Sequence, residues 1–287
     1  MRVRLIQVPY HLGHEGVGMG AGPERLVAAG AVEALGRAGH DADLDRVRAE
    51  PETNEVAASF RVAARVADRV RDAVAASAFP LVLSGNCMSA VGIVAGLDSR
   101  DLGVVWFDAH PDFNTAEATR SGFVDGMGLS ILTGTGWNAM RETIAGYRAL
   151  PERDVVLVGT RDADPAERDR LARSDVAVVS ARDVPDGLAT PLDTLARRAA
   201  DVYLHVDLDV VDPVEGRVNE YAARDGLRAE ALRSAIEGVG TRFGVRAAAL
   251  TAYDPACDPD GALARTAVEL VAALARAGVS SEEPVAA

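Results

Sequence analysis

Residues 105–114 read Val-Trp-Phe-Asp-Ala-His-Pro-Asp-Phe-Asn, an apolar run that ends abruptly in two aspartates and a histidine. A second apolar run, over residues 202–206, ends in the same way in Asp207-Leu-Asp209. Short apolar runs of this kind are typical of strands that are buried on both faces of a parallel sheet. Ligands of such sheets bind beyond the carboxyl ends of the strands, so both acidic clusters are expected to face one site.

The rest of the chain alternates between the same two patterns. Strand-like runs are predicted at 2–8, 79–84, 102–108, 154–159, 176–180, 202–207 and 247–251. Helical patterns separate them, at 24–38, 56–77, 165–174, 228–237 and 261–277. The alternation predicts a three-layer α/β/α fold with a mostly parallel sheet. We expect one domain over residues 1–287, with a small, acidic and frayed tail at 279–287.

Composition narrows the class of protein. The 287 residues are 48% hydrophobic and carry a net charge of −13 without a basic cluster, which argues against nucleic acid or an anionic membrane as a partner. No apolar run approaches the ~20 residues of a membrane span. Two cysteines do not make a disulfide framework, and Met1 is followed directly by a strand-like segment rather than a signal peptide. A cytoplasmic location is therefore expected.

The acidic clusters indicate bound cations. Several carboxylates cannot converge without a counter-charge, because an unpaired buried carboxylate is very costly. Residues two apart on a strand face the same side, so Asp207 and Asp209 can reach one centre. Oxygen-rich ligands with one imidazole suit Mn²⁺ foremost. Surface carboxylates at strand ends are the alternative interpretation, which explains one cluster but not two clusters and His110.

These motifs carry a family resemblance that spans most of the chain. Residues 108–114 resemble the Asp-Ala-His-x-Asp signature of the arginase/agmatinase (ureohydrolase) family, and residues 205–213 resemble its Ser-x-Asp-x-Asp-x-x-Asp-Pro signature. Residues 13–29 are similar to the family's glycine-rich loop and the helix after it. The resemblance implies an eight-stranded parallel sheet, a homo-oligomer (trimer or hexamer), and hydrolysis of a guanidino or related C–N bond with two Mn²⁺ ions.

The resemblance also implies a role for each ligand. Asp108 and Asp207 would bridge both ions, Asp112 would complete the first site, and His110 and Asp209 would complete the second. Asp112 would also hold the attacking water by a hydrogen bond, which makes it a catalytic candidate.

Two positions near the metal ligands depart from the family. Residues 84–89 read Ser-Gly-Asn-Cys-Met-Ser, where the family has Gly-Gly-Asp-His-Ser and its His binds the first ion. Cys87 would take that place as a thiolate ligand, and Zn²⁺ or Fe²⁺ would then compete better with Mn²⁺. The alternative is a small buried hydrophobic residue. Asp125 stands where arginases have a proton-shuttling His, and is either a catalytic acid/base or a loop aspartate before a glycine turn.

A third departure concerns the reacting end of the substrate. The family's strand ends in Glu-Val-x-Pro and its Glu pairs with the guanidinium, but the matching residue here is Ala252. A guanidinium without a carboxylate partner loses its best-oriented contact. Asp254, two residues on, is the candidate replacement; otherwise the reacting group differs from a plain guanidinium.

The other end of the substrate is predicted from two loops. Asn114, Thr119 and Ser121 resemble the arginase segment that binds the α-carboxylate. Asp164, with Glu167 nearby, resembles the arginase loop that meets the α-amino group, although Asp164 before a proline is also a helix N-cap. These loops favour an α-amino acid over a decarboxylated amine.

Two functions follow from these patterns. The first is a binuclear manganese hydrolase that cleaves the guanidino group of an L-amino acid, or a modified group such as N-hydroxyguanidino, to urea or a urea derivative plus an amine. The second is a metal-binding but non-hydrolytic relative with a binding or regulatory role. His205, on the strand face of Asp207, is expected to be a buried supporting residue rather than a ligand.

Overall fold

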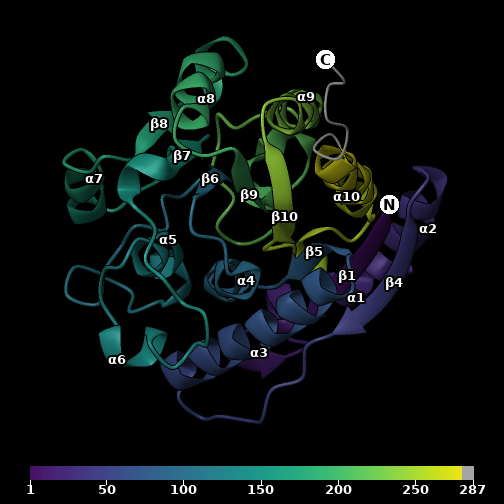
Figure 1. Cartoon of the computed structure of the whole chain (residues 1–287), viewed down its shortest axis with the longest axis horizontal. Helices are drawn as coiled ribbons and strands as arrows, with labels where there is room; N and C mark the ends of the chain where they lie inside the picture. Colours follow the sequence, from purple (N-terminus) through teal and green to yellow (C-terminus); the bar gives the residue numbers. More distant parts are fainter. Residues whose placement is uncertain (280–287) are drawn as a thin grey trace.

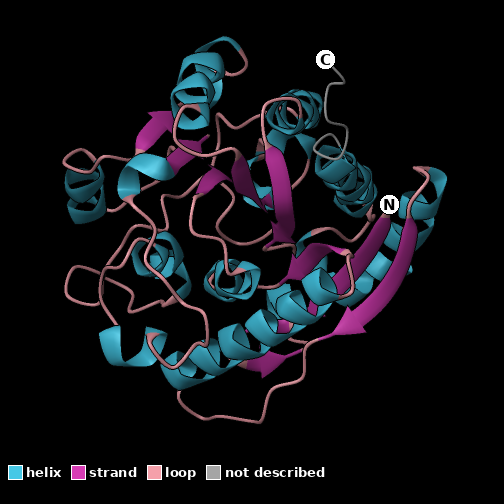
Figure 2. Cartoon of the chain, viewed as in Figure 1, coloured by secondary structure: helices cyan, strands magenta, loops and turns pink. Residues whose placement is uncertain are grey.

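The computed structural model describes residues 1–279 and confirms the three-layer α/β/α fold (Figures 1 and 2). One eight-stranded sheet, parallel throughout, forms the middle layer. In spatial order its strands are β4 (Asp41–Arg46), β1 (Arg2–Val8), β5 (Phe79–Ser84), β10 (Gly244–Thr251), β9 (Asp201–Asp207), β6 (Leu102–Phe107), β7 (Val155–Val158) and β8 (Ala177–Val179). The tail that was expected to fray lies, from residue 280 on, outside the described residues.

Helices cover both faces of the sheet, and the sheet divides the hydrophobic core into two clusters. One face packs against α1 (Gly22–Ala28), α2 (Ala31–Arg37), α8 (Ala189–Ala196), α9 (Ala229–Gly240) and α10 (Ala262–Val279). The other packs against α3 (Glu55–Ala75), α4 (Ser89–Leu97) and α5 (Gly128–Leu132), with α6 (Asn138–Arg141) and α7 (Pro165–Leu171) at its side. Val105 and Phe107 of β6 belong to the first cluster and Trp106 to the second, which explains the continuous apolar run.

Several elements differ from the sequence prediction, and three of them have a clear local reason. The helix predicted over 24–38 is two helices, because Gly30 adopts a φ of 102° between α1 and α2. Strand β4 was not predicted because it is a charged edge strand, paired with β1 alone. Helix α4 was not predicted because it is apolar on every side. It packs against α3 so closely that a Cβ on Gly92 would lie 2.1 Å from the carbonyl oxygen of Ala63.

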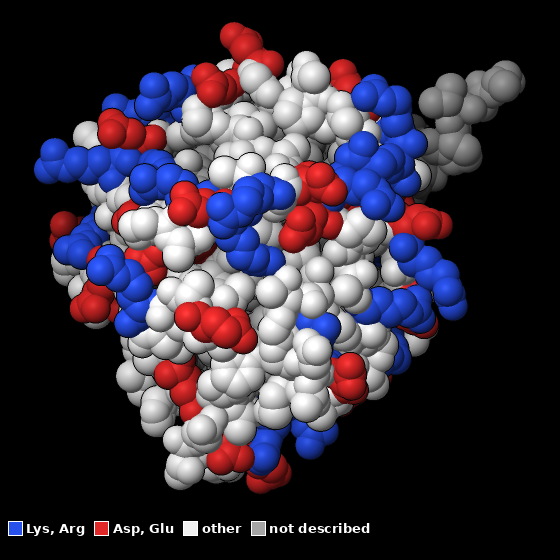
Figure 3. All heavy atoms as spheres, turned by 90° about the vertical axis from the view of Figure 1, so that its left-hand side faces the viewer, with Lys and Arg blue, Asp and Glu red and all other residues white. Residues whose placement is uncertain are grey.

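The N-terminal glycine-rich segment forms a short antiparallel hairpin, β2 (Tyr10–His11) and β3 (His14–Glu15), beyond the carboxyl end of β1. On the face of the molecule in Figure 3, arginine and acidic side chains are interspersed rather than gathered by sign. Within residues 1–279, no helix is both long and apolar enough to cross a membrane.

Candidate active site

A cavity of about 530 Å³ opens at the carboxyl ends of β5, β6, β9 and β10. Its lining is strongly acidic and contains no arginine among the described residues. The acidic side chains that line it are Glu55, Asp112, Asp125, Asp162, Asp164, Glu167, Asp207 and Asp209. The cavity lies where the sequence predicts the site, beyond the carboxyl ends of the two strands that precede the acidic motifs.

The first acidic cluster follows β6. Asp108 is buried, and its two carboxylate oxygens accept hydrogen bonds from the backbone amide of His110 (2.7 Å) and from Nε1 of Trp106 (2.9 Å). Asp112 has a left-handed backbone (φ 48°), and its carbonyl accepts bonds from the amides of Leu129 and Ser130. The carboxylate of Asp112 accepts no hydrogen bond from the described residues, which leaves its lone pairs available in the cavity lining.

The second cluster follows β9 and meets the first. One oxygen of Asp207 accepts the amide of Asp209 (2.8 Å). Asp209 in turn accepts the amide of Ala109 (3.2 Å), and its other oxygen lies 3.2 Å from Nδ1 of His110. The two motifs, about 100 residues apart in sequence, are therefore in direct contact.

Burial sets the electrostatics of this cluster. Desolvation raises the pKa of Asp108 to about 6, and it holds the pKa of Asp112 and of Asp207 well above the ordinary range. Burial opposes the charge on His110, but Asp209 and Asp108 outweigh it and raise the pKa of His110 to about 12. Against the same burial, the charge of His110 lowers the pKa of Asp209 to about 2. The metal-free cluster therefore holds protons that divalent cations would displace.

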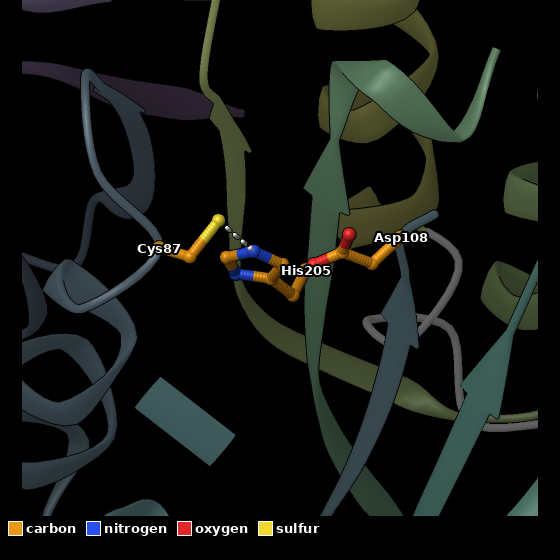
Figure 4. A group of neighbouring side chains, drawn as sticks. All are labelled: Cys87, Asp108 and His205. Carbon is orange, nitrogen blue, oxygen red and sulfur yellow. Dashed lines mark hydrogen bonds between the residues drawn. The ribbon is translucent and has the colours of Figure 1, made fainter. Parts of the chain in front are cut away.

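Cys87 lies in the loop between β5 and α4 and joins this cluster. Its Sγ lies 2.9 Å from Oδ2 of Asp207, 3.1 Å from Oγ1 of Thr251 and 3.3 Å from Nε2 of His205. Figure 4 shows the side chains of Cys87, His205 and Asp108 side by side. Ligand atoms of these three residues lie within 4.8 Å of one another, as do those of Asp108, His110 and Asp209. Carboxylate, imidazole and thiol donors at this spacing fit two divalent cations.

Asp125 lines the cavity and also fixes the Cys87 loop. Its Oδ2 accepts Nδ2 of Asn86 (2.6 Å), and its Oδ1 accepts the amide of Met88 (2.7 Å). Burial raises the pKa of Asp125 to about 6, against these hydrogen bonds. A carboxyl group with a pKa near neutrality can both accept and donate a proton.

Four of the six residues predicted to bind substrate line the cavity: Asn114, Ser121, Asp164 and Glu167. Asn114 donates Nδ2 to Oδ2 of Asp164 (3.3 Å). Asp164 is the N-cap residue of α7, as its alternative role predicts, and Glu167 accepts the amides of Phe113 (2.9 Å) and Asp164 (3.3 Å).

The other two predicted residues are not in the cavity lining. Thr119 accepts the amide of Gly122 (3.0 Å) and shapes the loop that carries Ser121. Asp254 accepts the amide of Ala256 (2.9 Å) at the start of a short 3₁₀ turn, Pro255–Cys257, outside the cavity. The strand ends before Ala252, which takes a left-handed φ of 64°, so residues 252 and 254 do not share a face. Ala252 itself lines the cavity.

The comparisons with known proteins agree with this geometry. The model of the arginase family matches residues 1–276. The chain belongs to the arginase family.

Relatives of this arginase-family chain match over nearly its whole length. An arginase from Bacillus caldovelox is 29% identical over 301 residues, which cover 95% of this chain and 97% of the relative. The crystal structure of an arginase from Bacillus cereus has a TM-score of 0.87 at 25% identity and covers both chains completely. The native B. caldovelox arginase structure has a TM-score of 0.87 at 27% identity and covers 99% of each chain. Membership makes the chain a metal-dependent amidinohydrolase.

The arginase-family signatures did not reveal several side chains of the site. Asn219 is buried and donates Nδ2 to Oδ2 of Asp209 (3.4 Å) and to the carbonyl of Ala252 (2.9 Å). Phe123 and Tyr221 stack at the cavity mouth, with ring centroids 5.7 Å apart. They come from loops without periodicity, so no repeating pattern predicted that their rings would stack.

His205 did leave a signal in the sequence, because it stands where the family signature has Ser. It is fully buried, as expected, and desolvation lowers the pKa of His205 to about 3, so its imidazole is neutral.

Proposed function

We propose that this arginase-family enzyme hydrolyses the guanidino or modified guanidino group of an L-amino acid, giving urea or a urea derivative and an amine. The observation that carries the proposal is the convergence of the two motif clusters on one acidic cavity. Four buried carboxylates, an imidazole and a thiol meet there without an arginine in the lining.

The cofactor is proposed to be two Mn²⁺ ions. Asp108 and Asp207 would bridge them, Cys87 and Asp112 would complete the first site, and His110 and Asp209 the second. The uncommitted carboxylate of Asp112 and the contact of Cys87 with Asp207 support this ligand set. Zn²⁺ or Fe²⁺ would compete at the Cys87 position because sulfur is a softer ligand. When bound, the ions would supply water acidified to a nucleophile at neutral pH.

Side chains of the protein would orient the attacking water and protonate the leaving nitrogen. Asp112 would accept a hydrogen bond from the attacking water and hold it toward the central carbon of the substrate. The water gives up a proton as its oxygen bonds to that carbon, the C–N bond breaks with its electron pair going to the nitrogen, and the leaving amine takes up a proton delivered by Asp125. Asp125 is the proposed proton carrier, because it lines the cavity and its pKa of about 6 lies near neutrality.

The substrate is proposed from the two ends of the cavity. Asn114, Ser121, Asp164 and Glu167 would bind the α-amino and α-carboxylate groups, which favours an amino acid over agmatine. At the reacting end, Ala252 provides no carboxylate. A less basic tail needs that partner less, since charge pairing contributes less to its binding. We therefore infer a modified guanidino group, such as that of N-hydroxyarginine.

We also propose a cytoplasmic location, a single domain and a homo-oligomeric assembly. The two cysteines, Cys87 and Cys257, are free thiols, which supports a reducing cytoplasm. The eight-stranded sheet, whose strands come from residues 2 to 251 of the chain, supports one domain. The family resemblance supports a homo-oligomer, trimer or hexamer, whose partner at the site is a small amino acid rather than nucleic acid or membrane.

Metal analysis combined with a substrate screen tests the function. The purified protein should contain two divalent cations per chain and release hydroxyurea from N-hydroxyarginine faster than urea from arginine. Agmatine, which lacks the α-carboxylate, should be the poorest of the three. If agmatine is the best substrate, the assignment of the Ser121 and Asp164 loops is wrong. If both ions are bound and no guanidino compound is turned over, the non-hydrolytic alternative is correct.

A further inference from the structure

We propose that His205 is a positioning residue for Cys87: its Nε2–H donates to Sγ and holds the sulfur in place as a ligand of the first metal position. This inference deepens the proposed function and rests on its assignment of Cys87 as a ligand. It assigns a role to a buried histidine that the metal ligand set leaves unused.

Cys87 and His205 come from two separate segments that meet at the metal end of the cavity, the loop after β5 and strand β9. Their side chains are in contact, with 3.3 Å between Sγ and Nε2 (Figure 4). Cys87 lines the cavity wall, and His205 lies in the buried layer behind it, where it is 0% exposed. An imidazole in this place can reach the sulfur without reaching the open cavity.

The orientation of the His205 ring is fixed on two sides. The indole of Trp106 stacks on it, with centroids 3.6 Å apart and an interplanar angle of 16°. The hydroxyl of Tyr203 lies 2.8 Å from Nδ1. When that hydroxyl donates to Nδ1, the single proton of the neutral imidazole resides on Nε2, which is the nitrogen that faces the sulfur.

The sulfur has three polar neighbours, of which Nε2 of His205 and Oγ1 of Thr251 can donate a hydrogen bond to it. Oδ2 of Asp207 accepts from the thiol at 2.9 Å, and Oγ1 of Thr251 lies 3.1 Å away. Once the thiol has lost its proton to become a ligand, a carboxylate beside it is repulsive. An N–H directed at an anion makes a stronger hydrogen bond than one directed at a neutral group. Removing such support behind a metal ligand costs about 10- to 100-fold in metal affinity.

Cobalt-loaded protein provides the test, because a thiolate on Co²⁺ gives a sulfur-to-metal charge-transfer absorption. His205→Leu removes the N–H, and His205→Gln keeps a side-chain N–H at a similar reach. We expect His205→Leu to shift the band to longer wavelength and to weaken Co²⁺ binding at the first site about 10- to 100-fold. His205→Gln should retain most of both properties. Tyr203→Phe, which removes only the hydroxyl, should shift the band in the same direction by a smaller amount. This variant replaces His205→Leu in the test if His205→Leu does not fold.

A second background makes the test specific for the sulfur. In Cys87→His protein the ligand is an imidazole with no thiolate to support, so adding His205→Leu should change the affinity by less than about threefold. An equal loss in both backgrounds would mean a merely structural role and would overturn the proposal. Loss of the first ion in both His205→Leu and His205→Gln would also overturn it, since His205 would then be a direct ligand.

These readouts do not depend on turnover. If the band and affinities behave as expected but no guanidino compound is hydrolysed, the proposed function fails and the role of His205 stands. A wild-type cobalt protein without the charge-transfer band refutes Cys87 as a ligand and this inference with it, while the substrate screen still decides the hydrolysis.

Discussion

The two ends of the cavity are built in different ways. The metal end is built around Asp108, Asp207 and Asp209, which are buried at or just beyond the ends of β6 and β9 and accept hydrogen bonds from backbone amides. The substrate end consists of loop residues such as Ser121 and Tyr221, which are exposed at the cavity mouth. Sheet register places the first group, whereas only contacts between loops place the second.

The register of the sheet explains why the sequence alone predicts that the two acidic motifs lie at one edge of the sheet. Phe107 pairs with Val206, and Asp207 pairs with Thr251, so the strand ends that carry Asp108 and Asp207 are level with each other. Parallel strands that end together must present the next residues at one edge of the sheet. The loops have no comparable constraint.

The largest effect is expected at the metal end. Asp207→Asn should lose bound metal and lower kcat/KM by roughly 10³-fold or more, because the acidified water and the charge stabilisation that the metals supply are worth several kcal/mol. Asp201→Asn is the matched control at the other end of β9, where Asp201 has only a 3.9 Å ion pair with Arg246. Metal content and urea release, measured for both variants, test this prediction. Full metal content in Asp207→Asn contradicts the assignment.

Glu167 is a residue of the substrate end that is buried like those of the metal end. Burial raises its pKa from 4.5 to about 7, so the folded protein binds this proton more tightly than the unfolded chain. Its contribution to stability is present below pH 4.5 and is lost as the pH rises through about 7. For metal-free protein the loss amounts to at most about 3 kcal/mol.

Urea unfolding of metal-free protein between pH 5 and pH 8 measures this loss. Glu167→Gln, which resembles the protonated acid, should show a smaller decrease in unfolding free energy over that range than wild type. Parallel curves for the two proteins would show that Glu167 does not titrate in this window.

The reacting end is tested by restoring the missing carboxylate. Ala252→Glu should raise the ratio of kcat/KM for arginine to that for N-hydroxyarginine by roughly 10- to 100-fold, because a hydrogen bond to a charged group is worth about 1.5–3 kcal/mol. Ala256→Glu adds the same charge on the exposed 3₁₀ turn nearby and should leave the ratio unchanged. Steady-state kinetics on both substrates measure the ratio, and an equal change in the two variants would point to a general charge effect.

The smallest effect is expected at the mouth. Ser121→Ala should raise KM for the amino-acid substrate by roughly fivefold, the loss of one hydrogen bond of about 1 kcal/mol. Turnover of agmatine, which has no α-carboxylate, should not change. Thr119→Ala is the comparison, since Thr119 shapes the same loop without lining the cavity. Equal effects of Ser121→Ala on both substrates would remove Ser121 from the carboxylate site.

The sequence predicted those parts of the molecule that a repeating pattern determines. Strand β5 begins and ends where its apolar run does, and the ligand side chains follow from their position after strands. Strand β4 has no apolar run because it is an edge, and α4 has no periodicity because it is buried on every side. Asp254 was placed on the face of residue 252 by assuming that the strand continued, but the chain turns left-handed at Ala252. Asn219 and Tyr221 depend on a long-range loop fold that carries no local signal.

The acidic lining of the cavity has a consequence for the rates of encounter and release. Two divalent cations would neutralise only half of the eight carboxylates in the lining, on a chain whose net charge is already −13. The remaining field draws cationic molecules toward the opening and slows the approach of anions. Association of a cationic substrate should thus weaken as salt rises, because added ions shorten the screening length below about 10 Å. An uncharged urea-type product leaves this field freely, whereas the amine product must escape it.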